Sequence, residues 1–405
     1  MAGLIGIDEA RRRVLEAVRP LAAEQVPLGE ALGRVLAEEV RSAVDVPPFD
    51  GSAMDGFAVS AGARGSLRVD GESRAGSPSD RQVGPETAVR ISTGAQVPEG
   101  TGAVVPLEQA EEDGAGNVEV GAPASGANIR RRGEDLRAGD PVMAAGGTLS
   151  PAALGVLASV GLSAAGCAAR PAVAIVATGD ELVEPGEPLG RGQIWSSNPP
   201  ALAGQVALAG GVVERAGRVP DDAAETRRAL EQAVDAADVV CVSGGVSVGP
   251  HDHVKGALAA IGAEESFWGV ALRPGKPTWF GTAPGAGRPV LVFGLPGNPV
   301  SAMVTFHLFV RPALRGLQGA DPDAPRGVAV LDEPVARHPR RVQAVRCRLR
   351  NAADGLHAAP TGPQGSHMLT SMLAADALAL VQAGDGALEA GERVQVEVLD
   401  LARLR

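Results

Sequence analysis

The sequence predicts a multidomain α/β protein whose largest domain is a doubly wound sheet. Its 405 residues suggest about two to four domains. Residues 170–315 alternate between short apolar β-like runs and helical runs, the pattern of a parallel sheet with helices on both faces. Residues 46–140 instead contain short β-like runs separated by Gly, Ser and Pro, which indicates a separate β-rich domain.

The N-terminal part predicts helices. Residues 7–18 place apolar side chains along one helical face, with Asp8 as a candidate N-cap, and residues 28–40 show a similar pattern. Ser150 and Pro151 form an N-cap and first helical position, so another helix is expected to begin there. We expect that helix to pack on the N-terminal helices.

These elements predict four domains. The helical domain would comprise residues 1–45 and 141–169, with the β-rich domain, 46–140, inserted into it. The α/β domain follows at 170–315. After a linker rich in Asp, Pro and Gly, alternating segments predict a C-terminal β domain over 316–405.

Composition excludes several kinds of partner. The net charge of −11, the aromatic content of 2% and the absence of Tyr argue against binding to nucleic acid or an anionic membrane. The three cysteines lie far apart, which signals neither a disulfide framework nor a zinc site. The uncharged stretches 141–169 and 289–310 are interrupted by Pro, so we predict no membrane span and expect a cytoplasmic protein.

Three Gly-containing loops follow strands of the predicted sheet: 178–181, 243–247 and 295–299. Ligands of open α/β sheets bind at the carboxyl ends of the strands, and Gly lets backbone N–H groups approach an oxyanion closely. One such loop is more simply explained as an ordinary turn. Three loops on one edge favour a site for phosphate or another oxyanion.

Charged residues on the same edge suggest a metal. Asp180, Glu181 and Asp252 would suit Mg²⁺ held against phosphate oxygens, although each alone is better explained as an N-cap or a solvated side chain. Residues 273–277, RPGKP, carry two cations that would hold an anion or merely form a solvated turn. The histidines flanking Asp252 are better explained as helix-start residues than as metal ligands.

The β-rich domain contributes two further motifs. Residues 45–59, DVPPFDGSAMDGFAV, form a loop that would display Asp50 and Asp55. Residues 128–135, NIRRRGED, place three arginines beside two carboxylates. Spacing alone leaves two interpretations open: a surface ion-pair cluster, or an anion clamp opposite the α/β site.

Nine motifs together resemble one family. They are PPFDGSAMDGFAV (47–59), ISTGAQVPEG (91–100), NIRRRGED (128–135), ATGDEL (177–182), GQIWSSN (192–198), SGGVSVGPHD (243–252), RPGKP (273–277), LPGNPVSA (295–302) and PTGPQGS (360–366). In this order, over nearly the whole chain, they resemble the MoeA molybdopterin molybdenumtransferases, relatives of the gephyrin E domain. The resemblance implies an α/β domain of the molybdopterin-binding type, a helical domain with an inserted β-rich domain, and a C-terminal β-barrel-like domain.

The resemblance also implies a function. An elongated homodimer would bind adenylylated molybdopterin and molybdate in a cleft shared between the α/β domain of one subunit and the β-rich domain of the other. It would release molybdenum cofactor and AMP in a Mg²⁺-dependent transfer. Two alternatives are a molybdopterin adenylyltransferase, which the extra domains and the SAMDG loop disfavour, and a non-catalytic dimeric scaffold of the gephyrin E type, which would be expected to have long linkers.

Site residues follow from the resemblance, position by position. The implied catalytic residues are Asp55, Glu181, Asp252 and Lys276, with Glu181 and Asp252 as the Mg²⁺ ligands. The implied substrate-binding residues are Thr93, Arg130, Asp135, Asp221, Gly244, Gly245, Ser247, Arg273, Pro296, Pro299 and Ser366. Several positions depart from the family pattern: Gly269 stands where a lysine often follows the tryptophan, Ser196 replaces a frequent Asp, Gly51 replaces a frequent Asn, and Thr101-Gly102 replaces Ala-Asp.

Overall fold

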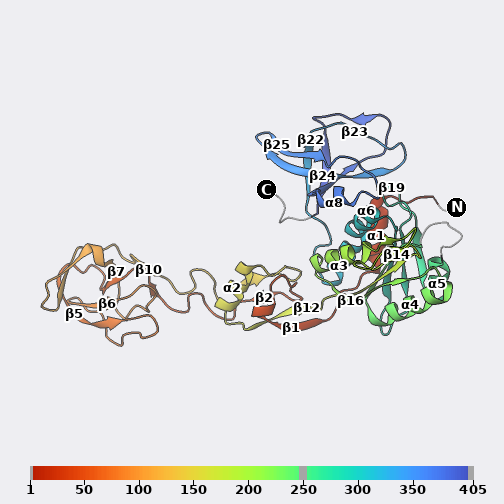
Figure 1. The fold of residues 1–405 in the computed structure, drawn as a ribbon. Coiled ribbons are helices and arrows are strands. Elements are labelled where there is room, and N and C mark those ends of the chain that lie inside the picture. Colours follow the sequence, from red (N-terminus) through yellow and green to blue (C-terminus); the bar gives the residue numbers. More distant parts are fainter. Residues whose placement is uncertain (1–2, 246–252, 400–405) are drawn as a thin grey trace.

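The computed structural model describes residues 3–245 and 253–399. The molecule is elongated, with a β-rich domain at one end and both termini at the other (Figure 1). A small domain containing α2 (Pro151–Ser159), β1 (Ala23–Pro27), β2 (Val40–Arg41) and β12 (Ala164–Ala168) lies between the β-rich domain and the α/β domain. The C-terminal β domain packs beside the α/β domain.

The α/β domain is built on a six-stranded sheet. Its strands, in spatial order, are β16 (Val212–Val219), β13 (Ala172–Thr178), β17 (Val239–Ser243), β21 (Val290–Leu295), β20 (Trp279–Ala283) and β18 (Glu264–Trp268). The first four strands are parallel, but β20 and β18 are antiparallel to their neighbours. The prediction of a wholly parallel sheet is therefore wrong at this edge, where β20 and β21 follow each other without a crossover helix.

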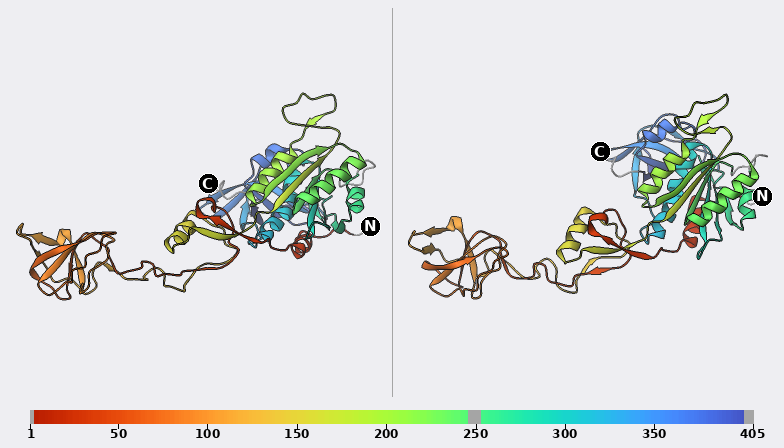
Figure 2. Two further views of the ribbon diagram at one scale, coloured as in Figure 1. Left: turned by 90° about the horizontal axis from the view of Figure 1, so that it is seen from below. Right: turned by 60° about the horizontal axis from the view of Figure 1, so that its bottom comes forward.

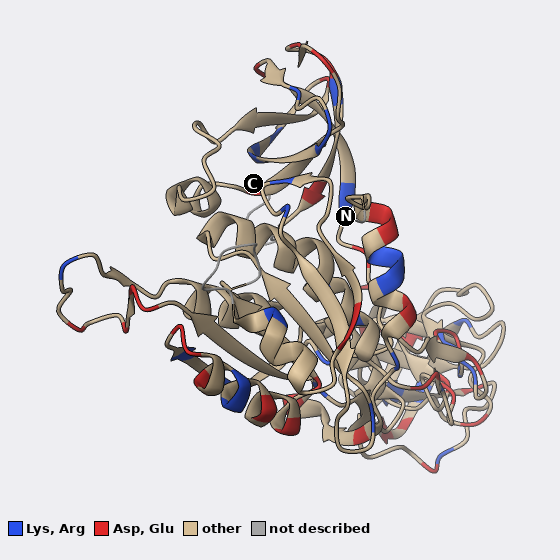
Figure 3. Ribbon diagram, turned by 90° about the vertical axis from the view of Figure 1, so that its right-hand side faces the viewer, with Lys and Arg blue, Asp and Glu red and all other residues tan. Residues whose placement is uncertain are grey.

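Helices cover both faces of this sheet, as the doubly wound prediction requires. On one face lie α3 (Asn198–Leu208), α6 (Pro299–Thr305), a π-helical turn (Phe306–Val310), α7 (Arg311–Leu317) and α1 (Ile7–Ala17). On the other lie α4 (Ala223–Ala236) and α5 (Val254–Ala260). Val173 and Ile175 of β13 face the first layer, while Ala174 and Val176 face the second, the period-two alternation of a strand buried on both sides. Figure 3 shows charged residues mainly on the outer helices and loops, and few on the central strands.

The β-rich domain is a second six-stranded sheet, joined to the rest of the chain by two connecting segments. Its order is β7 (Ala103–Pro106), β4 (Gly56–Val59), β6 (Thr87–Ile91), β5 (Gly65–Ser73), β9 (Asn117–Val120) and β8 (Ala110–Glu112). A short pair, β3 (Gly51–Ser52) with β10 (Ile129–Arg130), and a 3₁₀ turn (Leu107–Gln109) complete it. Gly56 allows close strand packing, because a Cβ there would lie 1.9 Å from the Val105 carbonyl oxygen.

The small domain corrects two expectations. Residues 28–40 form only a 3₁₀ turn (Leu28–Glu30) and then extended chain, with Val35 and Leu36 bridged to Thr148 and Cys167. Here α2 (Pro151–Ser159) packs with the paired strands β1 (Ala23–Pro27) and β12 (Ala164–Ala168), and with β2 (Val40–Arg41) and β11 (Pro141–Met143). It does not pack on α1, which belongs to the α/β core and whose N-cap is Gly6 rather than Asp8.

The C-terminal domain is a closed barrel, as expected. β24 (Val342–Ala352), β25 (Gly355–Pro360), β22 (Arg326–Leu331), β28 (Arg393–Val398) and β26 (Ala377–Val381) pair in a ring that β24 and β26 close. The remaining elements are β19 (Leu272–Arg273), β23 (Val335–Ala336), β27 (Ala387–Leu388) and α8 (Leu369–Leu373). β19 of the α/β domain pairs with β24, so the two domains share a strand contact.

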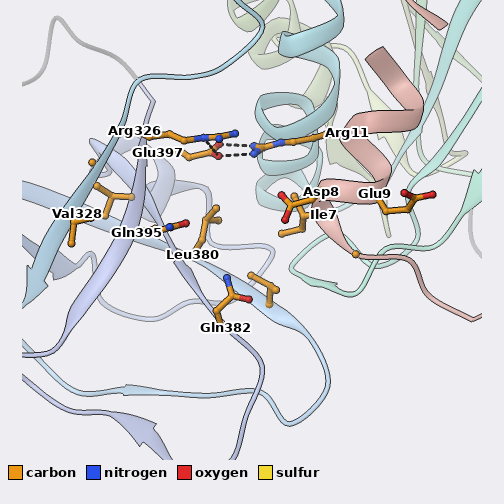
Figure 4. Close-up of a pocket in the computed structure, with 14 residues that line it drawn as sticks. Ile7, Asp8, Glu9, Arg11, Arg326, Val328, Leu380, Gln382, Gln395 and Glu397 are labelled. Atoms are coloured by element: carbon orange, nitrogen blue, oxygen red, sulfur yellow. Dashed lines mark hydrogen bonds and ion pairs between the residues drawn. The ribbon is translucent and has the colours of Figure 1, made fainter. Parts of the chain in front are cut away.

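A buried ion-pair network also joins the barrel to the α/β domain (Figure 4). Glu397 of β28, 1% exposed, accepts two hydrogen bonds from Arg11 of α1, at 2.7 and 2.6 Å, and one from Arg326 Nε at 3.1 Å. Burial raises the pKa of Glu397, but contacts with His307 and Arg11 outweigh it and hold the pKa well below its usual range. Because burial lowers the pKa of His307, 3.6 Å away, the compensating charge comes from the two arginines.

No helix within residues 3–245 and 253–399 has both the length and the apolar character needed to cross a bilayer.

Candidate active site

A cleft of about 730 Å³ opens at the carboxyl ends of β13, β17 and β21. All three predicted loops reach it: Thr178, Gly179 and Glu181 from the first, Ser243–Gly245 from the second, and Pro296–Pro299 from the third. Asp221 and the start of α3 complete the rim, together with His367 of the C-terminal domain. The cleft therefore lies where ligands of open α/β sheets bind.

Two glycines make a close backbone contact possible here. A Cβ on Gly244 would lie 2.7 Å from the Thr178 carbonyl oxygen, and one on Gly245 would lie 2.4 Å from Val254 Cγ2. Both residues have positive φ, 94° and 62°. The turn after β17 thus requires glycine for conformation and for space, which leaves backbone rather than side chain at the cleft wall.

Three buried polar atoms on the cleft wall have no hydrogen-bond partner in the described part of the chain: Thr178 Oγ1, Ser196 Oγ and Asn198 Oδ1. Asn198 is held in place by its own amide, which donates to Ser243 Oγ at 2.7 Å and to the Gly297 carbonyl at 2.8 Å. An unsatisfied buried polar atom costs roughly 1–3 kcal/mol. Three in one cleft indicate hydrogen-bonding capacity kept for a ligand.

Sequence reasoning did not single out these three side chains as candidate site residues. All lie in the motifs ATGDEL and GQIWSSN, but the lack of a partner is a property of the folded cleft and not of the spacing. At α3 the first turn contains Pro199 and Pro200, which carry no N–H group. The donors available on this wall are therefore the Thr178 and Ser196 hydroxyls more than the helix end, because the Gly244 N–H already donates to the Leu295 carbonyl at 3.1 Å.

The acidic residues of the cleft have an open arrangement. Glu181 and Asp221 are exposed on its rim, and Asp180 Oδ1 is occupied by the Asp221 N–H at 3.0 Å. Within the described ranges, no group of three or more His, Cys, Asp or Glu side chains could enclose a metal. One or two carboxylates fit Mg²⁺ nevertheless, because that ion keeps several waters and takes further oxygens from substrate phosphate.

Other predicted residues of the α/β and C-terminal domains line the cleft, lie beside it, or lie outside the described residues. Pro296 and Pro299 line the cleft, and Ser366 lies beside it, its carbonyl accepting the Val300 N–H at 3.1 Å. Lys276 is exposed next to the lining residue Pro277. Ser247 and Asp252 lie outside the described residues, as does His251.

Arg273 lines a neighbouring cleft of about 400 Å³ instead, together with Arg346 of β24. Arg346 is fully buried and donates to Ser371 Oγ at 3.0 Å and to the Gly365 carbonyl at 3.1 Å. Burial lowers its pKa to about 10, so it stays charged at neutral pH. No carboxylate pairs with it in the described ranges, so Arg346 is a buried cation suited to an anion. The site residues predicted from the sequence did not include it.

Asp55, Thr93 and Arg130 belong to or adjoin β4, β6 and β10 of the β-rich domain, which lies at the far end of the molecule from the α/β domain (Figure 1). Asp135 lies on a segment that connects the β-rich domain to the small domain, where its N–H donates to the Val46 carbonyl at 3.0 Å. Asp55 Oδ1 accepts the Thr93 N–H at 2.7 Å, so these two belong to one surface. In NIRRRGED, Arg131 pairs with Asp50 and Arg132 with Asp45. Arg130 is exposed and has no ion-pair partner among the residues that the structure describes.

Comparison with known proteins assigns the chain to a family. Family models match residues 5–161 (MoeA N-terminal region, domain I and II), 174–316 (probable molybdopterin binding domain) and 328–399 (MoeA C-terminal region, domain IV). Molybdopterin molybdenumtransferase of Haemophilus influenzae is 37% identical over 97% of this chain and 98% of its own. That of Bacillus subtilis is 34% identical over 97% and 93%.

A solved structure agrees. The molybdopterin biosynthesis MoeA protein from Pyrococcus horikoshii OT3 superimposes with a TM-score of 0.83 at 29% identity, over 98% of this chain and 100% of that one. Fold and cleft thus define a multidomain α/β protein of the molybdopterin-binding type. The chain belongs to the MoeA family.

Proposed function

We propose that this MoeA family member inserts molybdate into adenylylated molybdopterin, releasing molybdenum cofactor and AMP in a Mg²⁺-dependent reaction. Its place in molybdenum cofactor biosynthesis and its transferase class follow from its full-length relatives, which are named molybdopterin molybdenumtransferases. The observation that supports the substrate is the cleft itself, where the Gly244–Gly245 turn and the unpartnered hydroxyls of Thr178 and Ser196 line a wall suited to phosphate, and the unpartnered Asn198 Oδ1 can accept from a donor of the substrate.

Each part of the cleft has a role in this proposal. The Ser196 hydroxyl and the Gly245 backbone N–H would orient the pyrophosphate link by hydrogen bonds. Glu181, with Asp252 as a second expected ligand outside the described residues, would hold Mg²⁺. When bound, the ion neutralises charge that develops on the phosphate oxygens as the link is cleaved. Lys276 at the rim would face the same charge.

The neighbouring cleft suits molybdate, the inorganic substrate. Arg273 and Arg346 supply two guanidinium groups for a doubly charged tetrahedral oxyanion, and only one carboxylate, Glu333, lines the same wall. A hydrogen bond from Arg346 links the two clefts, because its acceptor, the Gly365 carbonyl, belongs to the loop that continues through Ser366 to His367 on the rim of the first cleft. In this cleft the buried charge of Arg346 lacks a partner that substrate would supply, just as the three unpartnered polar atoms do in the first cleft.

The β-rich residues would act from a second copy. In the structure the β-rich domain lies far from the α/β domain of the same chain. Its predicted site residues Asp55, Thr93 and Arg130, with Asp135 on the connecting segment, would therefore act on the cleft of a second subunit, so we propose a homodimer with a shared cleft. Size-exclusion chromatography with light scattering tests this, with a mass near 82 kDa expected from about twice the 40.9 kDa subunit. A mass near one subunit would contradict the shared cleft.

The activity test is direct. Purified protein with adenylylated molybdopterin and Mg²⁺ should release AMP only when molybdate is added. Glu181→Gln should slow that release, while Glu184→Gln, at an exposed residue three positions further on that does not line the cleft, should not. Absence of molybdate-dependent AMP would refute the transferase. Conversion of ATP and molybdopterin into the adenylylated form would support the adenylyltransferase alternative instead.

A further inference from the structure

One aromatic side chain among the described residues is exposed to solvent. The chain contains seven Phe, three Trp and no Tyr, all in the described residues, and of these only Trp195 is exposed, at 53%. Trp279 is 3% exposed, and Trp268 is half-buried beneath the Lys255 ammonium. An exposed indole presents a large, rigid apolar face to a ligand when it lies at a binding cleft, so its position decides whether it has a binding role.

Trp195 lies on the wall of the active-site cleft. It belongs to an arm, residues 182–196, that begins at β14 (Leu182–Val183) and returns at β15 (Ile194–Trp195), projecting from the α/β domain in Figure 2. Apart from the His367 imidazole, it contributes the sole aromatic ring among the described residues that line the cleft. The next residue is Ser196, whose buried hydroxyl is one of the three unpartnered atoms.

The arm holds this indole in a fixed position. β14 and β15 pair in parallel, the Ile194 N–H donates to the Glu181 carbonyl at 2.8 Å, and the Ser196 N–H donates to the Val183 carbonyl at 2.8 Å. The indole Nε1–H donates to the Glu187 carbonyl at 2.9 Å across the arm. With its polar edge satisfied within the arm, the ring offers the cleft its faces, which stack on planar heterocycles.

We propose that Trp195 is a platform on which a planar heteroaromatic ring of the substrate stacks, and so a positioning residue for the transfer. This inference rests on the proposed function, because adenylylated molybdopterin carries two such rings, adenine and pterin. Stacking on Trp195 would place the attached phosphate beside Ser196 and the glycine turn. In this arrangement the cleft wall supplies the hydrogen bonds to the phosphate, and Trp195 on the arm determines which ring of the substrate is bound.

Calorimetric titration of two probes, AMP and neopterin, tests the proposal in four proteins: wild type, Trp195→Ala, Trp195→Phe and Leu189→Ala. Trp195→Ala should weaken binding of one probe by about 5- to 150-fold, as expected for loss of one base stack. The affected probe identifies which ring stacks. Leu189→Ala, the matched control, removes an exposed side chain of the same arm that does not line the cleft, and should bind like wild type.

Trp195→Phe separates stacking from support of the arm. It keeps an aromatic face but loses the hydrogen bond to Glu187, so near-wild-type binding supports the platform. Binding as weak as in Trp195→Ala would overturn it, as would unchanged binding of both probes in Trp195→Ala. A dimer that dissociates in Trp195→Ala while binding is unchanged would assign the ring to a subunit contact and also overturn it.

Turnover gives a further readout. A stacked ring stabilises ground and transition states alike, so Trp195→Ala should raise KM for adenylylated molybdopterin with little change in kcat. Equal losses in kcat and kcat/KM would contradict the platform. If wild type releases no molybdate-dependent AMP but the probe titrations behave as above, the proposed reaction fails and the platform stands.

Discussion

Removing the charge of Glu397 should destabilise the junction between the barrel and the α/β domain. In Glu397→Gln, Arg11 stays 9% exposed but loses the two charged contacts of 2.7 and 2.6 Å. Breaking a buried ion pair from one side costs about 3–5 kcal/mol, because the remaining charge is left uncompensated. Arg326, whose side chain is 45% exposed, can rehydrate and adds little to that cost.

Native-state hydrogen exchange measures this change where it acts. Amides of β28 and β22 should open more easily in Glu397→Gln by about 3 kcal/mol, while those of β6 in the β-rich domain should not change. Arg11→Met with Glu397→Leu should recover much of the loss, since apolar residues often replace a buried pair at little cost. A loss below about 1 kcal/mol in Glu397→Gln would refute the reasoning, because that is the value of an exposed pair.

The same network predicts a dependence on pH. The folded-state pKa of Glu397 is depressed, so its stabilisation is complete above the unfolded-state pKa, about 4.3, and is lost as pH falls toward the folded-state value. The difference in stability between wild type and Glu397→Gln should therefore be constant near neutral pH and shrink as pH falls below about 5. A difference that is independent of pH down to pH 3 would contradict this assignment.

Three further changes test other parts of the molecule. Gly245→Ala should lower kcat/KM for AMP release at least tenfold, because its Cβ would meet Val254 at 2.4 Å at a φ of 62°; full activity would show that the turn is not a cradle. Ser196→Ala should raise KM about fivefold without loss of stability, and a thermal transition lowered instead would mean that the hydroxyl is structural. Ser150→Ala removes the cap on Ala153 at 3.2 Å and should cost α2 about 1 kcal/mol by denaturant unfolding, with activity unchanged; no cost would contradict the cap.

The sequence predicted the cleft better than the small domain. Alternating apolar runs identify strands and helices of the α/β domain because both faces of its sheet are buried, and loops after parallel strands must meet at one edge. Residues 28–40 have a helix-like pattern too. There Gly33, with φ of 75°, donates to the Leu149 carbonyl at 2.8 Å, and pairing with distant strands overrides the local propensity.

The residues that sequence reasoning missed share a physical reason. Asn198, Ser196 and Arg346 are distinctive because they are buried without a full set of partners, and burial and pairing are set by segments far apart in the chain. Asn198 is fixed by Ser243, 45 residues away. Trp195 stands out only once the other Trp and Phe side chains are known to be buried or half-buried.

The acidity of the chain and its anionic substrates become compatible once the two clefts are compared. In the phosphate cleft the groups with free capacity are neutral, two hydroxyls and an amide oxygen beside exposed carboxylates. Arginines there would compete with Mg²⁺ for the same carboxylates and phosphate oxygens. The neighbouring cleft has no such demand, and there Arg346 is buried and charged beside Arg273. A net charge of −11 thus disfavours polyanion surfaces, while in the proposed reaction neutral hydroxyls with Mg²⁺ would serve phosphate and local guanidinium groups would serve molybdate.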